Sequence, residues 1–350
     1  MRNFTFKRQL LFVMFMLLGC LSIQAADDGL ITKQITIKLD KAGTLPDKIG
    51  STKKKQITNL KIIGEINGTD WCFIREMAGC DYNCEKTGGK LSMLDLSDAK
   101  IVKGGLPYIK YNGGVYTSND KLGYAAFSDC SGLTSLTIPS SVTSIGEYAF
   151  DGCSGLTSLT IPSSVTSIGE YAFYGCSGLT SLTIPSNVTS IGESAFDGCS
   201  GLTSLTIPSS VTSIGYCAFL GCSGLTSFTI PSSVTSIGWG AFCGCSGLTS
   251  IYVYTEKLPN MGRDVFDGCD AKKCTVYVPK GTYDDYWISE FGYFENIVEF
   301  DPTGINNVIT SNDTKELSRY SLNGQRLSAP TKGLNIVKYS DGSVKKVAVQ

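Results

Sequence analysis

The stretch from Cys153 to Gly169 reads CSGLTSLTIPSSVTSIG, and close copies of it recur along the chain. Cysteine stands at positions 130, 153, 176, 199, 222 and 245, a constant spacing of 23 residues. A fixed period of about 20–29 residues is typical of leucine-rich solenoids, in which each repeat forms one coil. The repeat therefore predicts a solenoid in which every coil packs on its neighbours.

The apolar residues of one coil indicate which segments face the core. Leu159 and Ile161 are two residues apart, so they share the inward face of an extended strand, and Thr160 points outward. Pro162 is predicted to end this strand because proline has no N–H to give to a neighbouring strand. The apolar residues of the coil come in this order: Leu156, Leu159, Ile161, Val165, Ile168, Ala172 and Phe173.

The second half of the coil is predicted to turn the chain back. Gly169 is expected to permit a sharp bend, and Ala172 and Phe173 to lie on a short helical turn that closes the coil. Coils stacked about 4.8 Å apart then pair strand with strand and form one continuous apolar core. The expected fold class is a mainly β solenoid.

A family resemblance follows from this pattern. The series L-x-x-L-x-I-P-x-x-V-x-x-I-G-x-x-A-F-x-x-C, clear from Leu136 to Cys153 and in later coils, resembles the BspA-type leucine-rich repeats of bacterial surface proteins. The resemblance implies a leucine-rich repeat array between two caps. It also implies adhesion or host interaction at a cell surface, with host extracellular matrix among the candidate ligands.

The flanks of the array resemble the ends of such proteins. Upstream, ITNLKIIGEINGTDWCFIREM and KLSMLDLSDAKIV resemble irregular N-terminal coils, and KQITIKLDKAGTLPDKI before them predicts a strand and a short helix. Downstream, four aromatic residues with near-helical spacing are expected to cover the open end of the core: Tyr283, Tyr286, Trp287 and Phe291.

The C-terminal residues form a separate segment. YSLNGQRLSAPTKGLNIVKYSDGSVKKVAV resembles the C-terminal sorting domains of Bacteroidetes exported proteins, and Asn323-Gly324 and Asp341-Gly342 are hairpin signals. The expected division of the chain is a signal peptide at 1–25, an N-terminal cap with irregular repeats at 26–121, the array with its C-terminal cap at 122–300, a polar linker at 301–316 and a β tail at 317–350.

The first residues predict export. A basic start, an apolar run from Leu10 to Leu21 and small residues after it have the layout of a secretory signal peptide. The apolar run is shorter than the about 20 residues of a membrane span, and no transmembrane span is predicted elsewhere. Cleavage after Ala25 is favoured, and the alternative is lipidation of Cys20, because LLGC resembles a bacterial lipobox. The protein is therefore expected at the outer-membrane surface or secreted.

Composition excludes several classes of function. The chain has no histidine, which removes the usual catalytic triads and most catalytic zinc sites. The formal net charge is −1, so no basic surplus exists for nucleic acid, and no phosphate-binding motif or other cofactor signal is present. We expect a binding protein and not an enzyme; the alternatives are an accessory enzyme that degrades glycans or peptides, and a passive spacer.

The 14 cysteines allow two interpretations. Those at the 23-residue period are expected to be buried free thiols, because side chains at equivalent positions point the same way and not at one another. Three other pairs are candidate disulfides: Cys217 with Cys243, Cys80 with Cys84, and Cys269 with Cys274. A metal at Cys72, Cys80 and Cys84 is disfavoured, because no C-x-x-C pair occurs there.

The remaining candidate sites are on the surface. Outward serines and threonines form two polar rows along the strands, and carboxylates at equivalent turn positions are interpreted as solubilising charge. The candidate binding residues are aromatics on the turn before each cysteine: Tyr148, Tyr171, Tyr174, Tyr216 and Trp239. These aromatics suit contact with a protein or glycan, or packing within the turns, and both readings stay open. We expect a monomer without metal or cofactor.

Overall fold

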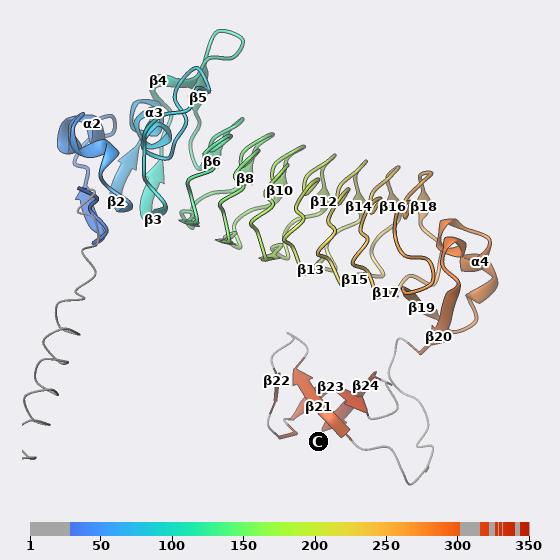
Figure 1. Cartoon of the computed structure of the whole chain (residues 1–350). Helices are drawn as coiled ribbons and strands as arrows, with labels where there is room; N and C mark the ends of the chain where they lie inside the picture. Colours follow the sequence, from blue (N-terminus) through green and yellow to red (C-terminus); the bar gives the residue numbers. More distant parts are fainter. Residues whose placement is uncertain are drawn as a thin grey trace, which may run out of the picture.

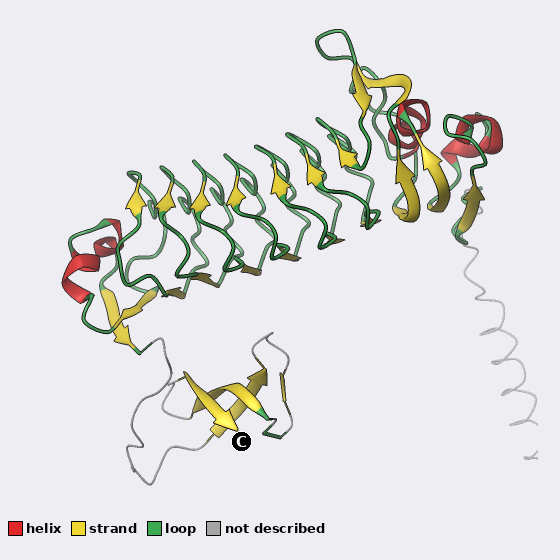
Figure 2. Cartoon of the chain, turned by 180° about the vertical axis from the view of Figure 1, so that it is seen from behind, coloured by secondary structure: helices red, strands yellow, loops and turns green. Residues whose placement is uncertain are grey.

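The computed structural model describes residues 29–301, 316–321, 326–327, 329–330, 332–339 and 344–349. The chain forms a row of stacked coils with a helical cap at either end, as Figures 1 and 2 show. The predicted signal peptide, Cys20, linker residues 302–315 and both hairpin dipeptides lie outside the described residues.

One long parallel sheet runs along the whole array. Its strands pair in register at the period of the repeat, so that Leu136 faces Leu159 and Leu182 faces Leu205. The strands, in spatial order, are β1 (Ile35–Lys38), β2 (Asn59–Ile66), β3 (Met93–Ile101), β7 (Ser135–Thr137), β9 (Ser158–Thr160), β11 (Ser181–Thr183), β13 (Ser204–Thr206), β15 (Ser227–Ile230), β17 (Ser250–Val253), β19 (Thr275–Pro279) and β20 (Asn296–Phe300).

A second parallel sheet lies on the opposite side of the coils, where Figure 2 shows its short arrows. Its five central strands carry the isoleucine that stands before the bend of each coil, so that Ile145 pairs with Ile168, and its two end strands carry Leu122 and Met261 at this position. The strands, in spatial order, are β18 (Asn260–Met261), β16 (Ser236–Ile237), β14 (Ser213–Ile214), β12 (Ser190–Ile191), β10 (Ser167–Ile168), β8 (Ser144–Ile145) and β6 (Lys121–Leu122).

The core between the sheets is a set of side-chain ladders. Leu159, Ile161, Val165 and Ile168 are all buried, as predicted. The phenylalanine of each coil stacks on that of the next, and the ring centroids of Phe173 and Phe196 are 5.2 Å apart with an interplanar angle of 2°. Burying one such side chain contributes about 1.5–3 kcal/mol, so each coil stabilises its neighbours. The prediction of a mainly β leucine-rich solenoid is confirmed.

The turn after the second strand differs from the prediction. Residues 170–175 form hydrogen-bonded turns without a helix, because Tyr171 has a φ of 55°. A residue in the left-handed region ends a right-handed helix before it can propagate. The predicted short helical turn at Ala172 and Phe173 is therefore wrong, although both residues are buried.

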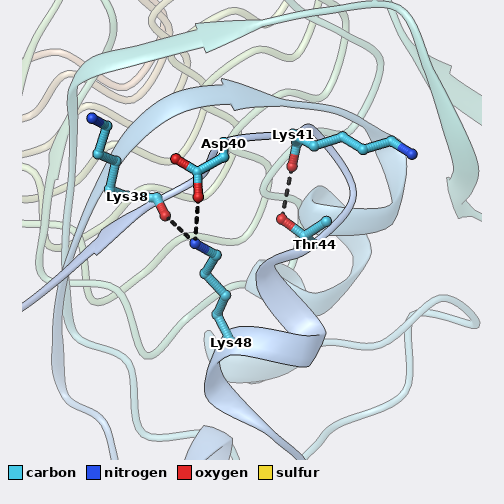
Figure 3. Close-up of polar contacts among 5 residues, drawn as sticks. All are labelled: Lys38, Asp40, Lys41, Thr44 and Lys48. Carbon is cyan, nitrogen blue, oxygen red and sulfur yellow. Dashed lines mark hydrogen bonds and ion pairs between the residues drawn. The ribbon is translucent and has the colours of Figure 1, made fainter.

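The N-terminal cap covers the first open end of the core. β1 is followed by α2 (Leu45–Ile49) and η1 (Lys53–Lys55), and α3 (Gly68–Met77) follows β2, so the predicted strand and short helix are both present. Lys48 Nζ ties α2 to β1 by donating to Lys38 O (2.8 Å) and Asp40 Oδ2 (3.1 Å), as Figure 3 shows. Thr44 Oγ1 donates to Lys41 O in the connecting turn.

A hairpin that the sequence did not indicate projects from this cap. It consists of β4 (Gly104–Ile109) and β5 (Val115–Thr117), which pair antiparallel (Figure 1). Tyr111 at its tip stacks on Tyr124 of the first regular turn, with ring centroids 4.9 Å apart. The hairpin thus meets the array at the turns that carry the candidate binding residues.

The C-terminal cap consists of α4 (Tyr283–Trp287) and η2 (Glu290–Tyr293), next to β19 and β20. Tyr286 and Phe291 are fully buried, and the ring of Phe291 packs 5.0 Å from that of Phe266, so these two close the core as predicted. The prediction was wrong for Tyr283 and Trp287. Both are exposed and stack on each other with ring centroids 6.1 Å apart, because residues four apart lie on the same side of a helix and this side of α4 faces solvent.

The tail forms a small antiparallel sheet of its own. Its strands, in spatial order, are β22 (Arg326–Leu327), β21 (Glu316–Ser321), β23 (Gly333–Tyr339) and β24 (Val344–Val349). Arg319 Nη1 donates to the side-chain oxygen of Asn335 in its interior at 3.2 Å.

Candidate functional site

Two exposed surfaces run the length of the array. We call the outward side of the long sheet the hydroxyl face; it consists of the serine and threonine that flank the buried residue of each strand from β7 to β15. We call the turns between the second-sheet strand and the next Gly-Cys pair, from residue 124 to residue 243, the aromatic ridge. Both surfaces repeat once per coil.

Threonines at two positions of each coil differ in whether their hydroxyls form hydrogen bonds. Thr157 Oγ1, in the loop before the strand, donates to Thr134 O of the preceding coil (3.0 Å), and equivalent bonds recur along the array. Thr160 and Thr183 lie on the face itself; they are exposed, and their hydroxyls make no hydrogen bond within the described residues. The hydroxyls of Thr160 and Thr183 are therefore open to a ligand, whereas that of Thr157 is used between coils.

The ridge has an unusual backbone that repeats in every coil. We call the residue directly after the glycine that follows each second-sheet strand the first ridge position; it is Tyr124, Glu147, Glu170, Glu193, Tyr216 or Trp239. The residue after it has a positive φ in every turn: Ala125 (50°), Tyr148 (56°), Tyr171 (55°), Ser194 (46°), Cys217 (49°) and Gly240 (60°). Inter-coil backbone bonds hold this conformation, such as Tyr148 N to Glu170 O (3.0 Å). The ridge side chains are therefore presented by a rigid frame that each neighbouring coil reinforces.

The ridge rings contact one another in two groups. In the first, Tyr124 packs on Tyr148 (centroids 5.6 Å apart), Tyr148 stacks on Tyr171 (4.8 Å, 3° between planes), and Tyr171 lies 6.1 Å from Tyr174. In the second, Tyr216 stacks on Trp239 at 4.8 Å, and Trp239 Nε1 donates to Asp264 Oδ2 at 3.0 Å. Stacking fixes the rings, so a ligand would meet edges and outer faces that lose little freedom on binding.

The structure separates the five candidate binding residues into two kinds. Tyr174, Tyr216 and Trp239 expose 44%, 45% and 39% of their surfaces, which leaves them available for contact. Tyr148 and Tyr171 are half-buried and pack on each other within the turns. Packing within the turns therefore describes Tyr148 and Tyr171. Contact with a ligand remains a prediction for the three exposed residues.

Sequence reasoning missed Tyr111 and Tyr124, which extend the ring series onto the hairpin. A signal existed for Tyr124: GYAAF at 123–127 occupies the repeat position of GEYAF at 146–150. None existed for Tyr111, because its approach to Tyr124 depends on the tertiary placement of the β4–β5 hairpin.

Carboxylates share the ridge with the rings. Glu147 and Glu170 are exposed, and Glu193 Oε1 accepts a hydrogen bond from the Tyr171 hydroxyl at 2.7 Å. That bond, with burial, raises the pKa of Tyr171 to about 12, so its phenol stays neutral. Burial, helped by the nearby charge of Asp129, raises the pKa of Asp151 to about 6.

The cysteines are free throughout the described residues, including the three pairs considered as disulfides. The thiols at the 23-residue period are buried, and the five from Cys153 to Cys245 each donate to the carbonyl of the phenylalanine 26 residues earlier, as Cys176 Sγ does to Phe150 O at 3.1 Å. Burial raises the pKa of Cys176 and Cys222 to about 12, which keeps these thiols protonated.

Other kinds of site have little support in the described part of the chain. No group of three or more cysteine or carboxylate side chains there is arranged to hold a metal ion. A cavity of about 350 Å³ lies beside the loop that leads to the C-terminal cap, lined among others by Thr235, Glu256 and Lys257. No described helix is long and apolar enough to cross a membrane.

Comparison with known proteins agrees with this architecture. The model of the BspA type leucine rich repeat region matches in six copies, over residues 116–226, 166–283 and 217–328. The chain belongs to this family. No curated protein matches it.

Several solved structures are similar to this BspA-type repeat protein. A leucine-rich repeat protein of T. pallidum is 34% identical, with a TM-score of 0.42, and the match covers 47% of this chain and 74% of that one. A leucine rich cell surface protein of Faecalibacterium prausnitzii is 22% identical (TM-score 0.30; 76% and 87% covered). A leucine-rich repeat protein of Bacteroides ovatus is 26% identical (TM-score 0.22; 55% and 67% covered).

Proposed function

We propose that this protein is exported and binds a protein or glycan at the cell surface through the outside of its repeat array. The observation that carries the proposal is the aromatic ridge, where Tyr174, Tyr216 and Trp239 are exposed on a rigid frame. Large aromatic side chains dominate the energetics of many interfaces, and a repeated surface raises avidity by multiplicity. Host extracellular matrix is a candidate source of the ligand.

The sequence of the leader supports export, because residues 1–25 have the layout of a signal peptide, or of a lipoprotein signal if Cys20 is lipidated. The resemblance of residues 317–350 to sorting domains supports transport to the outer-membrane surface or release from it. Mass spectrometry of the protein recovered from its native cells tests this: an N-terminus at Ala26 supports cleavage, and a lipid on Cys20 supports the alternative.

Ligand binding is tested with the purified protein on an array of extracellular matrix proteins and glycans. We expect at least one ligand to bind the protein and to lose most of its affinity when Tyr174, Tyr216 and Trp239 are replaced together by alanine. Circular dichroism and thermal unfolding check that the variant keeps the fold. Retained affinity would move the site to the hydroxyl face, and no ligand at all would favour the spacer interpretation.

A further inference from the structure

The distribution of charge along the array is one-sided. Between Leu122 and Thr255 the sequence contains no lysine and no arginine, and it contains six carboxylates. All six lie on the turns of the aromatic ridge: Asp129, Glu147, Asp151, Glu170, Glu193 and Asp197. The hydroxyl face and the core carry none, so the negative charge of the array is concentrated on the same corner as its exposed rings.

No ion pair among the described residues involves these six carboxylates. The four ion pairs among the described residues all lie in the N-terminal cap, and they use Lys48, Lys54 and Lys61. Glu147 and Glu170 are exposed and occupy the same position in adjacent coils, whose strands pair in register, so two negative charges face solvent side by side on this corner. A cationic ligand would be attracted to both of them.

The rings select the kind of cation. At the first ridge position, Tyr124 precedes the three glutamates, and Tyr216 and Trp239 follow them, so the carboxylates lie between two aromatic groups. Guanidinium and ammonium groups are attracted both to carboxylates and to Trp and Tyr rings. A small metal ion would gain nothing from the rings, and a polyanion would be repelled.

We propose that the aromatic ridge binds a basic, extended polypeptide segment rich in arginine and lysine. The six turns from Tyr124 to Trp239 span five coil steps, about 24 Å, which an extended segment of about seven residues matches. Its cationic side chains contact the glutamates in the centre and the rings of Tyr216 and Trp239 at one end. This inference rests on the proposed function, because it names a ligand class for the same surface.

The test uses the purified protein and a fluorescent peptide of alternating arginine and glycine, with binding followed by anisotropy. Replacing Glu147 and Glu170 by glutamine should weaken binding about tenfold at low salt, because two of the central charges are lost. The matched control is Glu85→Gln with Glu295→Gln, which removes the same charge from exposed positions off the ridge. Binding should also weaken as salt rises, because screening acts on exposed charges.

A second pair of variants tests the rings. Tyr216→Gln with Trp239→Gln should weaken the peptide several-fold and keep the fold, since the related residue glutamate occupies this position in three other coils. Trp287→Gln in the exposed pair of the C-terminal cap is the control and should change nothing. Loss of affinity in both ridge variants and in neither control supports the proposal.

Three results would overturn it. Equal losses of peptide affinity in the ridge and control variants would mean that the peptide is attracted to the net negative charge of the whole protein and not to the ridge. Tighter binding of heparin, a polyanion, than of the peptide would mean that the carboxylates of the ridge do not determine which charged ligand the protein prefers. Absence of peptide binding, while a neutral glycan or another protein on the array still binds, would reject the basic ligand and leave the proposed function standing.

Discussion

The glycines of one coil serve two different physical purposes. Gly175 has a φ of 66°, a conformation that suits glycine. Gly169 was expected to permit a bend, but its φ is not positive. A Cβ there would lie 2.7 Å from both Glu147 N and Gly146 C of the preceding coil, so this residue is needed for close stacking of two backbones. The sequence marks both glycines equally, and only the stacked structure tells them apart.

We expect Gly169→Ala to cost about 2–4 kcal/mol of unfolding free energy, because the clash is with backbone that no rotamer change relieves. Gly175→Ala should cost about 1–2 kcal/mol, since its Cβ would have 3.9 Å of clearance and only the backbone conformation is strained. Urea unfolding of both variants measures the difference. A larger cost at Gly175 would contradict the assignment.

Asp151 is expected to make stability depend on pH. Its folded-state pKa of about 6 lies above the ordinary 3.8, so the folded state takes up a proton that the unfolded state does not. The free energy of unfolding should therefore rise as the pH falls through about 6 toward 4. Asp151→Asn should stabilise by about 0.5–1 kcal/mol at pH 7.5, a value reduced for partial exposure, and by little at pH 4.5.

Thermal unfolding across this pH range checks the expectation, with Asp267→Asn as the control. Asp267 holds the same repeat position as Asp151 but is exposed. A gain in stability that is the same at both pH values, or the same in both variants, would rule out the buried carboxylate as the cause.

At the scale of the element, similar threonines have unlike roles. The loop threonines bond the coils together, whereas those of the hydroxyl face have free hydroxyls. Thr157→Val should cost about 0.5–1.5 kcal/mol through loss of its bond to Thr134 O, and Thr160→Val should change stability by less than about 0.5 kcal/mol. Chemical denaturation of the two variants is the measurement, and equal costs would refute the distinction.

The thiols of the core form another inter-coil element. Since the thiols at the 23-residue period are buried, a thiol reagent should label them slowly or not at all in native protein, while exposed Cys84 reacts first. After denaturation without reductant, all thirteen described cysteines should react. A denatured count that is lower by two or more would show that disulfides form in the protein as prepared.

At the scale of the molecule, the in-register sheets predict modularity. Deleting the 23 residues from Ser154 to Cys176 joins Cys153 to Ser177 as one coil normally joins the next, so a shorter folded array should result. Deleting the 11 residues from Ser154 to Ser164 removes half a coil and should abolish cooperative unfolding. Circular dichroism melts compare the two. Loss of cooperativity in both would contradict independent stacking of coils.

The sequence by itself determined the solenoid, its period and its inward residues, because a repeat that recurs at a fixed spacing allows one stacking register. It also located five of the ridge aromatics and the unbridged thiols at the 23-residue period. Tertiary structure decided which rings are available: Tyr171 bonds Glu193 and packs on Tyr148, while Tyr174 stays exposed. It also brought Tyr111 to the ridge. Such contacts depend on how separate coils and the hairpin meet, which no single repeat encodes.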